Sequence, residues 1–169
     1  MPELAVAVLG PDRPGVIAAL SEVLLAGAGN LEDASMTILR GQFAMTLVVD
    51  VPQDADETTA RLRPVAERLG LLVSVRDAVA SDELPAGAPY VVRVHGADRP
   101  GIVHRVSSAI AAAGGNVTDL STRLAGGMYV LVAEIDLPVD PASLAAELAR
   151  LSAELDVEAR LEPADDDLL

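Results

Sequence analysis

The sequence predicts an α+β fold that is built twice, as two small domains in tandem. Residues 9–52 align with residues 95–138 without a gap, and the residues that the two stretches share are mostly Gly, Pro, Asp, Asn and Ser. Shared turn and polar residues at fixed offsets indicate a duplication, since similar packing alone would repeat only apolar residues. Each copy alternates short β-type runs with amphipathic helical stretches, which is typical of an α+β domain.

In the first copy, a β-type run over residues 3–9 ends at the turn sequence Gly-Pro-Asp-Arg-Pro-Gly, residues 10–15. The apolar residues that follow have the spacing of one helix face, and they are Val16, Ile17, Leu20, Val23 and Leu24. Gly27 and Gly29 then supply the end of this helix. Pro14 is expected at the first helical position, where its missing N–H costs nothing.

Two strands, residues 31–39 and 43–51, are expected to form a hairpin across Arg40-Gly41-Gln42. The remaining elements of this copy are a helix over residues 56–69 and a short strand over residues 71–75. Pro64 lies inside that helical pattern, so it should kink the helix or mark a later start. The resulting order, β-α-β-β-α-β, is that of a ferredoxin-like fold, with an antiparallel sheet and both helices on one face.

The same order repeats in the second copy, with strands over residues 90–95, 117–124, 129–137 and 157–161 and helices over residues 102–113 and 142–155. Between the copies the periodicity is lost in a stretch that holds two Pro and a Gly, which favours a linker. We therefore expect a first domain over residues 1–77, a linker over 78–89, a second domain over 90–162 and a solvated acidic tail over 163–169.

The composition argues against several kinds of function. The net charge is −14 at pH 7 and all 12 basic residues are Arg, so direct binding to the phosphates of a nucleic acid is not expected. A chain without Lys and Cys has no P-loop lysine, Schiff-base lysine, disulfide or cysteine metal site. Since no leader-type or bilayer-length apolar run occurs, we expect a cytoplasmic protein that does not enter the membrane.

The two histidines do not indicate a metal site. His95 and His104 have no Cys or carboxylate nearby at metal-ligand spacing. His95 ends a strand beside the repeated turn and would line the same pocket, whereas His104 falls in the first turn of a helix. No nucleophile elbow, metal-binding helix motif or Gly-rich phosphate loop is present, so we expect neither a cofactor nor catalytic residues.

The repeated turn is the first candidate for a binding site. The N-terminus of a helix offers unpaired N–H groups and a partial positive charge, which suit a carboxylate. Gly15 and Gly101 would let a ligand approach that backbone closely, and Asp12 and Asp98 could receive an ammonium group. Such a site is complementary to an α-amino acid zwitterion.

The same residues also allow a purely structural interpretation. Asp before a helix is often a cap that accepts an N–H from the first turn. The Gly-Asn pairs at residues 29–30 and 115–116 could be helix stops, but the amides of Asn30 and Asn116 can also donate and accept hydrogen bonds. Repetition favours a site but does not decide the question, because turn residues would be copied together with the fold.

Taken together, Asp-Arg-Pro-Gly after a first strand and Gly-Asn at the start of the next one, within β-α-β-β-α-β, resemble the ACT domain. The resemblance covers residues 3–77 and 90–161, and a chain of two such domains resembles the glycine cleavage system transcriptional repressor type of protein. ACT domains are small regulatory modules that commonly bind amino acids, often where two of them meet. The resemblance therefore implies a ligand between the first turn of one domain and the Asn-bearing strand of its neighbour.

Carried onto this sequence, the resemblance implies one set of ligand-binding residues in each copy: Asp12, Arg13, Gly15, Val16, Ile17 and Asn30, then Asp98, Arg99, Gly101, Ile102, Val103 and Asn116. The backbone N–H groups of the paired apolar residues would take the carboxylate, and the Arg residues would either serve it or point to solvent. Many amino-acid-binding relatives have Asn where this sequence has Asp, which implies either stronger recognition of an ammonium group or a turn that acts only as a cap.

We therefore expect a non-catalytic regulatory protein that senses a small amino acid, with glycine or serine favoured, through ACT-like domains that pair their sheets within the chain or in a homodimer. Its expected protein partner is one such as a transcription regulator of glycine metabolism. The alternative is a ligand-independent interaction module that antagonises a transcription factor or a metabolic enzyme, for which the acidic surface would suit a basic partner.

Overall fold

The computed structural model describes residues 2–79 and 87–164. The chain divides into two compact units, Met1–Ser81 and Asp82–Leu169, which are called the first and the second unit below. Of the predicted linker, residues 80–86 lie outside the described residues, and so do residues 165–169 of the predicted tail.

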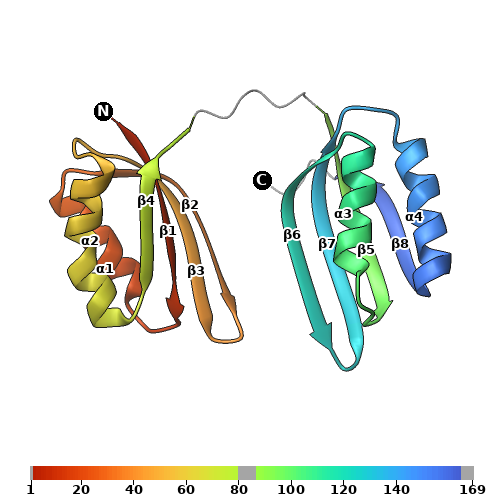
Figure 1. The fold of residues 1–169 in the computed structure, drawn as a ribbon, viewed down its shortest axis with the longest axis horizontal. Coiled ribbons are helices and arrows are strands. Elements are labelled where there is room, and N and C mark those ends of the chain that lie inside the picture. Colours follow the sequence, from red (N-terminus) through yellow and green to blue (C-terminus); the bar gives the residue numbers. More distant parts are fainter. Residues whose placement is uncertain (1, 80–86, 165–169) are drawn as a thin grey trace. The chain divides into compact units, whose positions relative to one another are not determined.

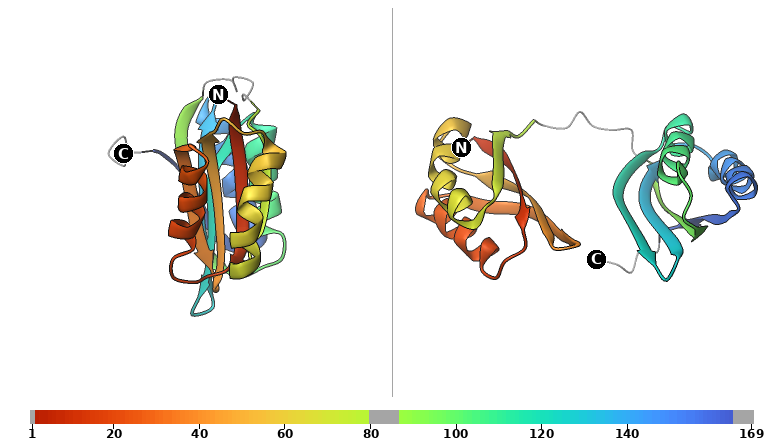
Figure 2. Two further views of the ribbon diagram at one scale, coloured as in Figure 1. Left: turned by 90° about the vertical axis from the view of Figure 1, so that its left-hand side faces the viewer. Right: turned by 60° about the horizontal axis from the view of Figure 1, so that its bottom comes forward.

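The first unit has the predicted element order. Its elements are β1 (Glu3–Pro11), α1 (Val16–Ala26), β2 (Asn30–Leu39), β3 (Gln42–Asp50), α2 (Ala55–Leu69) and β4 (Leu72–Asp77). The sheet has the order β2-β3-β1-β4, and each neighbouring pair is antiparallel. Both helices lie on the same face of this sheet (Figures 1 and 2).

The second unit repeats this arrangement. Its elements are β5 (Ala88–Ala97), α3 (Ile102–Ala112), β6 (Asn116–Ala125), β7 (Met128–Leu137), α4 (Pro141–Leu155) and β8 (Val157–Pro163). The sheet order is β6-β7-β5-β8, again antiparallel throughout. The predicted α+β, ferredoxin-like fold in tandem is thus confirmed. Strand β5 begins inside the predicted linker, and β8 includes the first residue of the predicted tail.

Each unit has its own hydrophobic core between the sheet and its two helices. In β1, the side chains of Leu4, Val6 and Val8 are buried, and the residues between them face the other side. Helix α1 buries Val16, Leu20 and Leu24, which follow the predicted helical spacing. In the second unit, equivalent positions of β5, β7, α3 and α4 enclose a second, separate cluster. Side-chain direction repeats every two residues in a strand and every 3.6 residues in a helix, and this repeat therefore sets which residues enter each core.

Both hairpins close with two residues in the left-handed region. Arg40 and Gly41 have φ of 49° and 80°, and Gly126 and Gly127 have φ of 59° and 81°. Two successive positive φ values are those of a type I′ turn, whose twist matches that of the paired strands. The predicted hairpins around residues 40–42 and 125–127 are therefore correct in position.

Three local expectations need correction or refinement. Helix α2 begins at Ala55 and continues through Pro64, so this proline does not mark a later start. Pro14 lies before α1, because Gly15 forms the N-cap and the helix starts at Val16. Position 29 needs a glycine because there is no room for a side chain, not because its φ is positive. A Cβ there would lie 2.6 Å from a side-chain carbon of Val51.

Candidate ligand-binding site at the first helix of each unit

The first helix of each unit begins without a side-chain cap. Gly15 and Gly101 are the N-cap residues of α1 and α3, with left-handed φ of 86° and 92°, and no side chain accepts a hydrogen bond from either helix start. The second helices differ, because Asp54 accepts from Glu57 N–H at 2.9 Å and Asp140 accepts from Ala142 N–H at 2.8 Å. Asp12 and Asp98 are thus not caps, and the amides of the first helices stay available.

The N-cap glycines border open space. A Cβ built on Gly15 or Gly101 would have no heavy atom within 4 Å. Val16 N–H makes only a long contact of 3.5 Å to the carbonyl of Arg13. In the part of the chain that the structure describes, no hydrogen bond is made by the N–H of Ile17 or of Ile102. The two helix starts can therefore donate to an external acceptor.

Buried side chains hold these helix starts in place. The side chains of Val16 and Ile102 are each 2% exposed, so the first residue of either helix is anchored in the core. Their successors Ile17 and Val103 point outward and are partly exposed. In the first unit, Asp12 N–H also donates to the carbonyl of Gly41 at 2.9 Å, which ties the turn to the β2–β3 hairpin.

The charged flanks of the two turns are not equivalent. Arg99 pairs with Asp156, with 3.2 Å between Nη2 and Oδ2. The residue of the first unit at the position of Asp156 is Gly70, and Arg13 has no ion-pair partner among the described residues. Among the described residues, the guanidinium group of Arg13 therefore has no carboxylate partner, whereas that of Arg99 has one.

Asn30 and Asn116 do not lie at these turns within their own units. Asn30 is paired with Asp50, which in turn is paired with Glu3 at the start of β1, whereas the turn follows the end of β1. Helix α1 separates the two ends by about 16 Å, since 11 residues rise about 1.5 Å each. Asn116 stands in the same relation to its own turn. A single unit therefore does not bring the predicted carboxamide to the predicted amides.

Asn30 instead borders a groove between α1 and β2. This groove has a volume of about 520 Å³, and its lining residues are Ala18, Ser21, Glu22, Leu24, Leu25, Gly29, Asn30 and Leu31. The apolar wall of this groove was not predicted from the sequence, although Leu25 is off the buried stripe of α1 and is 74% exposed. An exposed leucine on a helix next to an edge strand is the signal that could have indicated it.

The second unit has a hollow of about 280 Å³ between its two helices. It is lined by His104, Arg105, Ser108, Ala109, Ala112, Glu147, Arg150 and Leu151. Arg150 contacts Glu147 and Glu154, and Arg105 also contacts Glu154, so this wall is crossed by ion pairs. The hydrogen bond from Arg150 lowers the pKa of Glu147, and its positive charge acts in the same direction. Because these charges pair with each other, the hollow is not a simple anion site.

Contrary to the prediction from the sequence, His95 does not line the turn. It alternates with buried Val92 and Val94 on β5 and lies on the face of the sheet away from the helices. There its Nε2 is 2.9 Å from an oxygen of Glu158 on β8. The strand's alternation therefore directs His95 away from α3.

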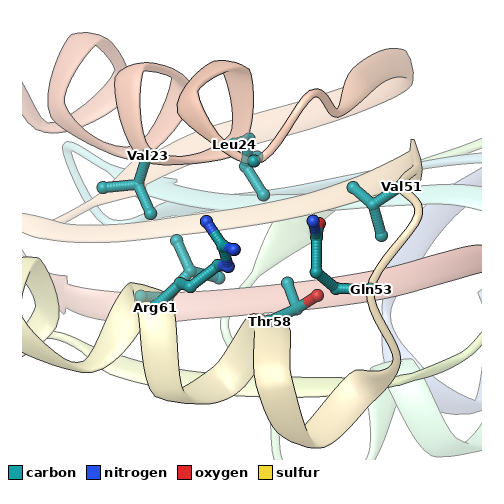
Figure 3. A pocket seen from close by; sticks show the side chains of 8 residues that line it. Val23, Leu24, Val51, Gln53, Thr58 and Arg61 are labelled. Atoms are coloured by element: carbon teal, nitrogen blue, oxygen red, sulfur yellow. The ribbon is translucent and has the colours of Figure 1, made fainter.

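A small cavity in the first unit lies between the end of α1 and the start of α2 (Figure 3). Val23, Leu24, Gln53, Thr58 and Arg61 are among its lining residues, and its volume is about 10 Å³. That volume is comparable to a single water molecule, so the cavity is too small for an amino acid.

Within residues 2–79 and 87–164, no group of three or more His, Asp or Glu side chains could hold a metal ion. None of the helices there is long and apolar enough to cross a bilayer.

The chain is similar to known proteins in sequence and in fold. The ACT domain family model matches residues 3–76 and again residues 89–162. The chain is 41% identical to a UPF0237 protein from Methanopyrus kandleri over 41% of this chain and 77% of that protein. It is 25% identical to the glycine cleavage system transcriptional repressor of Escherichia coli over 71% of this chain and 64% of that protein.

A solved structure covers nearly the full length. The crystal structure of an unknown protein from Galdieria sulphuraria is 27% identical, with a TM-score of 0.84 over 97% of this chain and 99% of that one. The family model accounts for most of the described residues in both units. The chain therefore belongs to the ACT domain family and contains that domain twice.

Proposed function

We propose that this protein is a non-catalytic, cytoplasmic regulator that binds a small amino acid where two ACT domains meet and thereby controls a protein partner. The observation that carries the proposal is the uncapped start of α1 and α3. Both starts have glycine at the N-cap and open space around it, whereas α2 and α4 have ordinary Asp caps. The N–H donors at the starts of both first helices have no side-chain acceptor. Such a helix start suits a ligand with a carboxylate.

The chemistry of the turn fits both ends of a zwitterion. The amides of Val16 and Ile17, or of Ile102 and Val103, would donate to the carboxylate, helped by a helix dipole equivalent to about half a positive charge. The carboxylate of Asp12 or Asp98 would accept from the ammonium group. A ligand with a small side chain, glycine or serine, is favoured, because the chain has only two Tyr and one Phe with which to line a site for a larger one.

Asn30 and Asn116 would complete the site from a neighbouring domain. Strands β2 and β6 are edge strands, so each leaves one row of backbone groups unpaired. If two such edges add antiparallel, the first residue of one strand lies beside the last residue of the other. Leu39, the last residue of β2, adjoins the hairpin turn in which the carbonyl of Gly41 accepts a hydrogen bond from Asp12 N–H. The Asn of one domain would thus reach the turn of the next.

The side of each unit that would receive such a neighbour carries exposed apolar residues. On the first unit these are Ile17, Leu25, Leu31, Met36 and Ile38, and on the second they are Val103, Leu120 and Leu124. Exposed apolar residues beside an open sheet edge are typical of a surface that another domain covers. A ligand bound at that contact would favour the paired arrangement, since it has higher affinity for it than for the separated one.

The proposed partner is a transcription regulator or a regulated enzyme. The repressor from Escherichia coli supports the first choice, because its name describes transcriptional control of glycine cleavage. With a net charge of −14, the chain itself is poorly suited to contact DNA, so control would pass through a protein.

The test is a thermal-shift and calorimetry screen of the full chain against the twenty amino acids. A ligand that binds only the folded state at about 100 times its Kd stabilises that state by about 2.7 kcal/mol. The variant Asp12→Ala with Asp98→Ala should lose this stabilisation. Its matched control, Asp56→Ala with Glu67→Ala, removes the same charge from the exposed face of α2 and should keep it. No response of the folded wild type to any amino acid would refute the proposal.

The same variants separate the sensor from a ligand-independent module. A sensor should bind its partner differently with and without the amino acid, and the Asp12→Ala, Asp98→Ala variant should abolish that difference. Partner binding that ignores both the ligand and the substitutions would favour the ligand-independent alternative.

A further inference from the structure

In each unit, the end of the second helix lies beside the repeated turn. A Cβ built on Gly70, the C-cap residue of α2, would lie 3.8 Å from Cγ of Pro11 in the first turn. The corresponding C-cap residue of α4 is Asp156, which contacts Arg99 in the second turn. The side chain at this position is therefore a neighbour of the start of the first helix.

In the second unit, carboxylates from the end of α4 hold both guanidinium groups at the start of α3. Nη2 of Arg99, in the turn, is 3.2 Å from Oδ2 of Asp156. Arg105, the fourth residue of α3, contacts Glu154 in the last turn of α4. A ligand carboxylate could pair with either guanidinium group only by displacing a carboxylate that the protein itself supplies.

The first unit has no such carboxylates at these positions. The end of α2 carries Arg68 and Gly70 where α4 carries the two acids. Arg13 has no ion-pair partner among the described residues, and it precedes the N-cap Gly15 by two residues. Since two residues span at most about 7 Å, the long side chain of Arg13 can reach an acceptor that is bound at the helix start.

Asp156 occupies a position that is locally unfavourable for it. Its φ is 52°, in the left-handed region, where the first unit has Gly70 with φ of 70°. Its carboxylate is also at the C-terminal end of α4, where the helix dipole disfavours a negative charge. In the part of the chain that the structure describes, the hydrogen bond from Arg99 is the only one that this carboxylate accepts. The contact with Arg99 is therefore what offsets these costs.

We propose that the end of α4 is an internal competitor for the ligand's carboxylate, so that the first unit has the tighter amino-acid site and the second unit the weaker one. This inference rests on the proposed function, because it concerns the same two turns. It assigns the difference to Asp156, which engages Arg99 and repels a second carboxylate at that turn.

The test follows backbone amide signals of the full chain in NMR titrations with the twenty amino acids, beginning with glycine and serine. The amide of Ile17 reports on the first turn and that of Val103 on the second. We expect the first turn to saturate at the lower amino-acid concentration. Asp156→Gly removes the competing carboxylate and suits the positive φ, so it should lower the Kd at the second turn about two- to fivefold. Asp156→Asn should act in the same direction, because Asn also tolerates the left-handed region but carries no charge.

The reciprocal variant places the carboxylate in the first unit. Gly70→Asp should raise the Kd at the first turn about two- to fivefold, and its Cβ would make only an ordinary contact with Pro11. Its matched control is Gly70→Asn, which carries the same backbone strain without the charge and should leave that Kd unchanged. A second control, Glu134→Gln, removes one exposed charge from the face of β7 away from the helices and should leave the Kd at both turns unchanged.

Failure of this inference can be distinguished from failure of the proposed function. If no amino acid shifts the signals of either turn, both are wrong. If both turns saturate at the same concentration, or if the Asp156 variants leave the second Kd unchanged, only the inference is wrong. An equal effect of Gly70→Asn or Glu134→Gln would also overturn it, since strain or net charge would then be the cause. The Asp156 variants decide the question by themselves if Gly70→Asp does not fold.

Discussion

Replacing Thr58 by valine should stabilise the first unit. The side chain of Thr58 is 3% exposed, and its hydroxyl has no hydrogen-bond partner among the described residues. It lies on α2 beside the small cavity formed with Leu24 and Gln53 (Figure 3). The second unit has Leu144 at the same position, where it is buried in the core. Valine has nearly the shape of threonine but no polar atom to desolvate.

The size of the effect follows from the environment of the hydroxyl. A buried polar group without a partner costs about 1–3 kcal/mol. The cavity beside it has a volume of about 10 Å³, so valine neither overfills the site nor leaves a larger hole. We therefore expect the free energy of unfolding of the first unit to rise by about 1–3 kcal/mol. For a domain of this size that corresponds to about 4–8 °C in Tm for each kcal/mol.

Native-state hydrogen exchange of the β1 and β3 amides measures the first unit separately from the second. The matched control is the neighbouring residue, Thr59→Val, because Thr59 Oγ1 already donates to the carbonyl of Ala55 at 2.7 Å. That variant should be neutral or destabilising. If Thr58→Val is neutral or destabilising as well, the hydroxyl is satisfied in solution, and the reasoning from its burial is wrong.

Three further predictions use the same kind of contrast. Asp54→Ala should destabilise the first unit by about 0.5–2 kcal/mol in urea titrations, because it removes a cap, whereas Asp12→Ala should have almost no effect. Gly29→Ala should cost about 1–3 kcal/mol in the same assay, since the site has no room for a methyl group. Arg150→Ala should raise the pKa of Glu147 toward its ordinary value in an NMR titration. Since the folded pKa of Glu147 is depressed, the stabilisation is present above pH 4.5 and is lost as the pH falls through the folded pKa, so wild type and variant should converge in acid.

The sequence predicted the element order because the signals involved are local. The apolar spacing of Val16, Leu20 and Leu24 defines one helix face by itself, and Gly41 after Arg40 is sufficient to predict a tight hairpin. The duplication strengthened each assignment, since the same pattern occurred twice. Pro64 was the exception, because the packing of α2 on the sheet holds the helix together across a residue that normally interrupts one.

The candidate site was predicted less completely, and the reason is that it depends on non-local pairing. The turn at Asp12 and Gly15 could be identified as an uncapped helix start only after the structure showed that Asp12 does not cap α1. The position of Asn30 at the opposite end of that helix follows from strand register, which is fixed by contacts between residues far apart in the chain.

By itself, the sequence determined that this protein has two copies of one α+β domain, where their helices and strands lie, and which turns repeat. These properties depend on residues a few positions apart, so composition and spacing are enough to specify them. Only the tertiary structure decided that Asn30 and Asn116 lie at the far end of the first helix from the turns of their own units, and that Arg99 pairs with Asp156. Those properties depend on which strands lie side by side and in what register, and the free energy that fixes the register comes from the whole core.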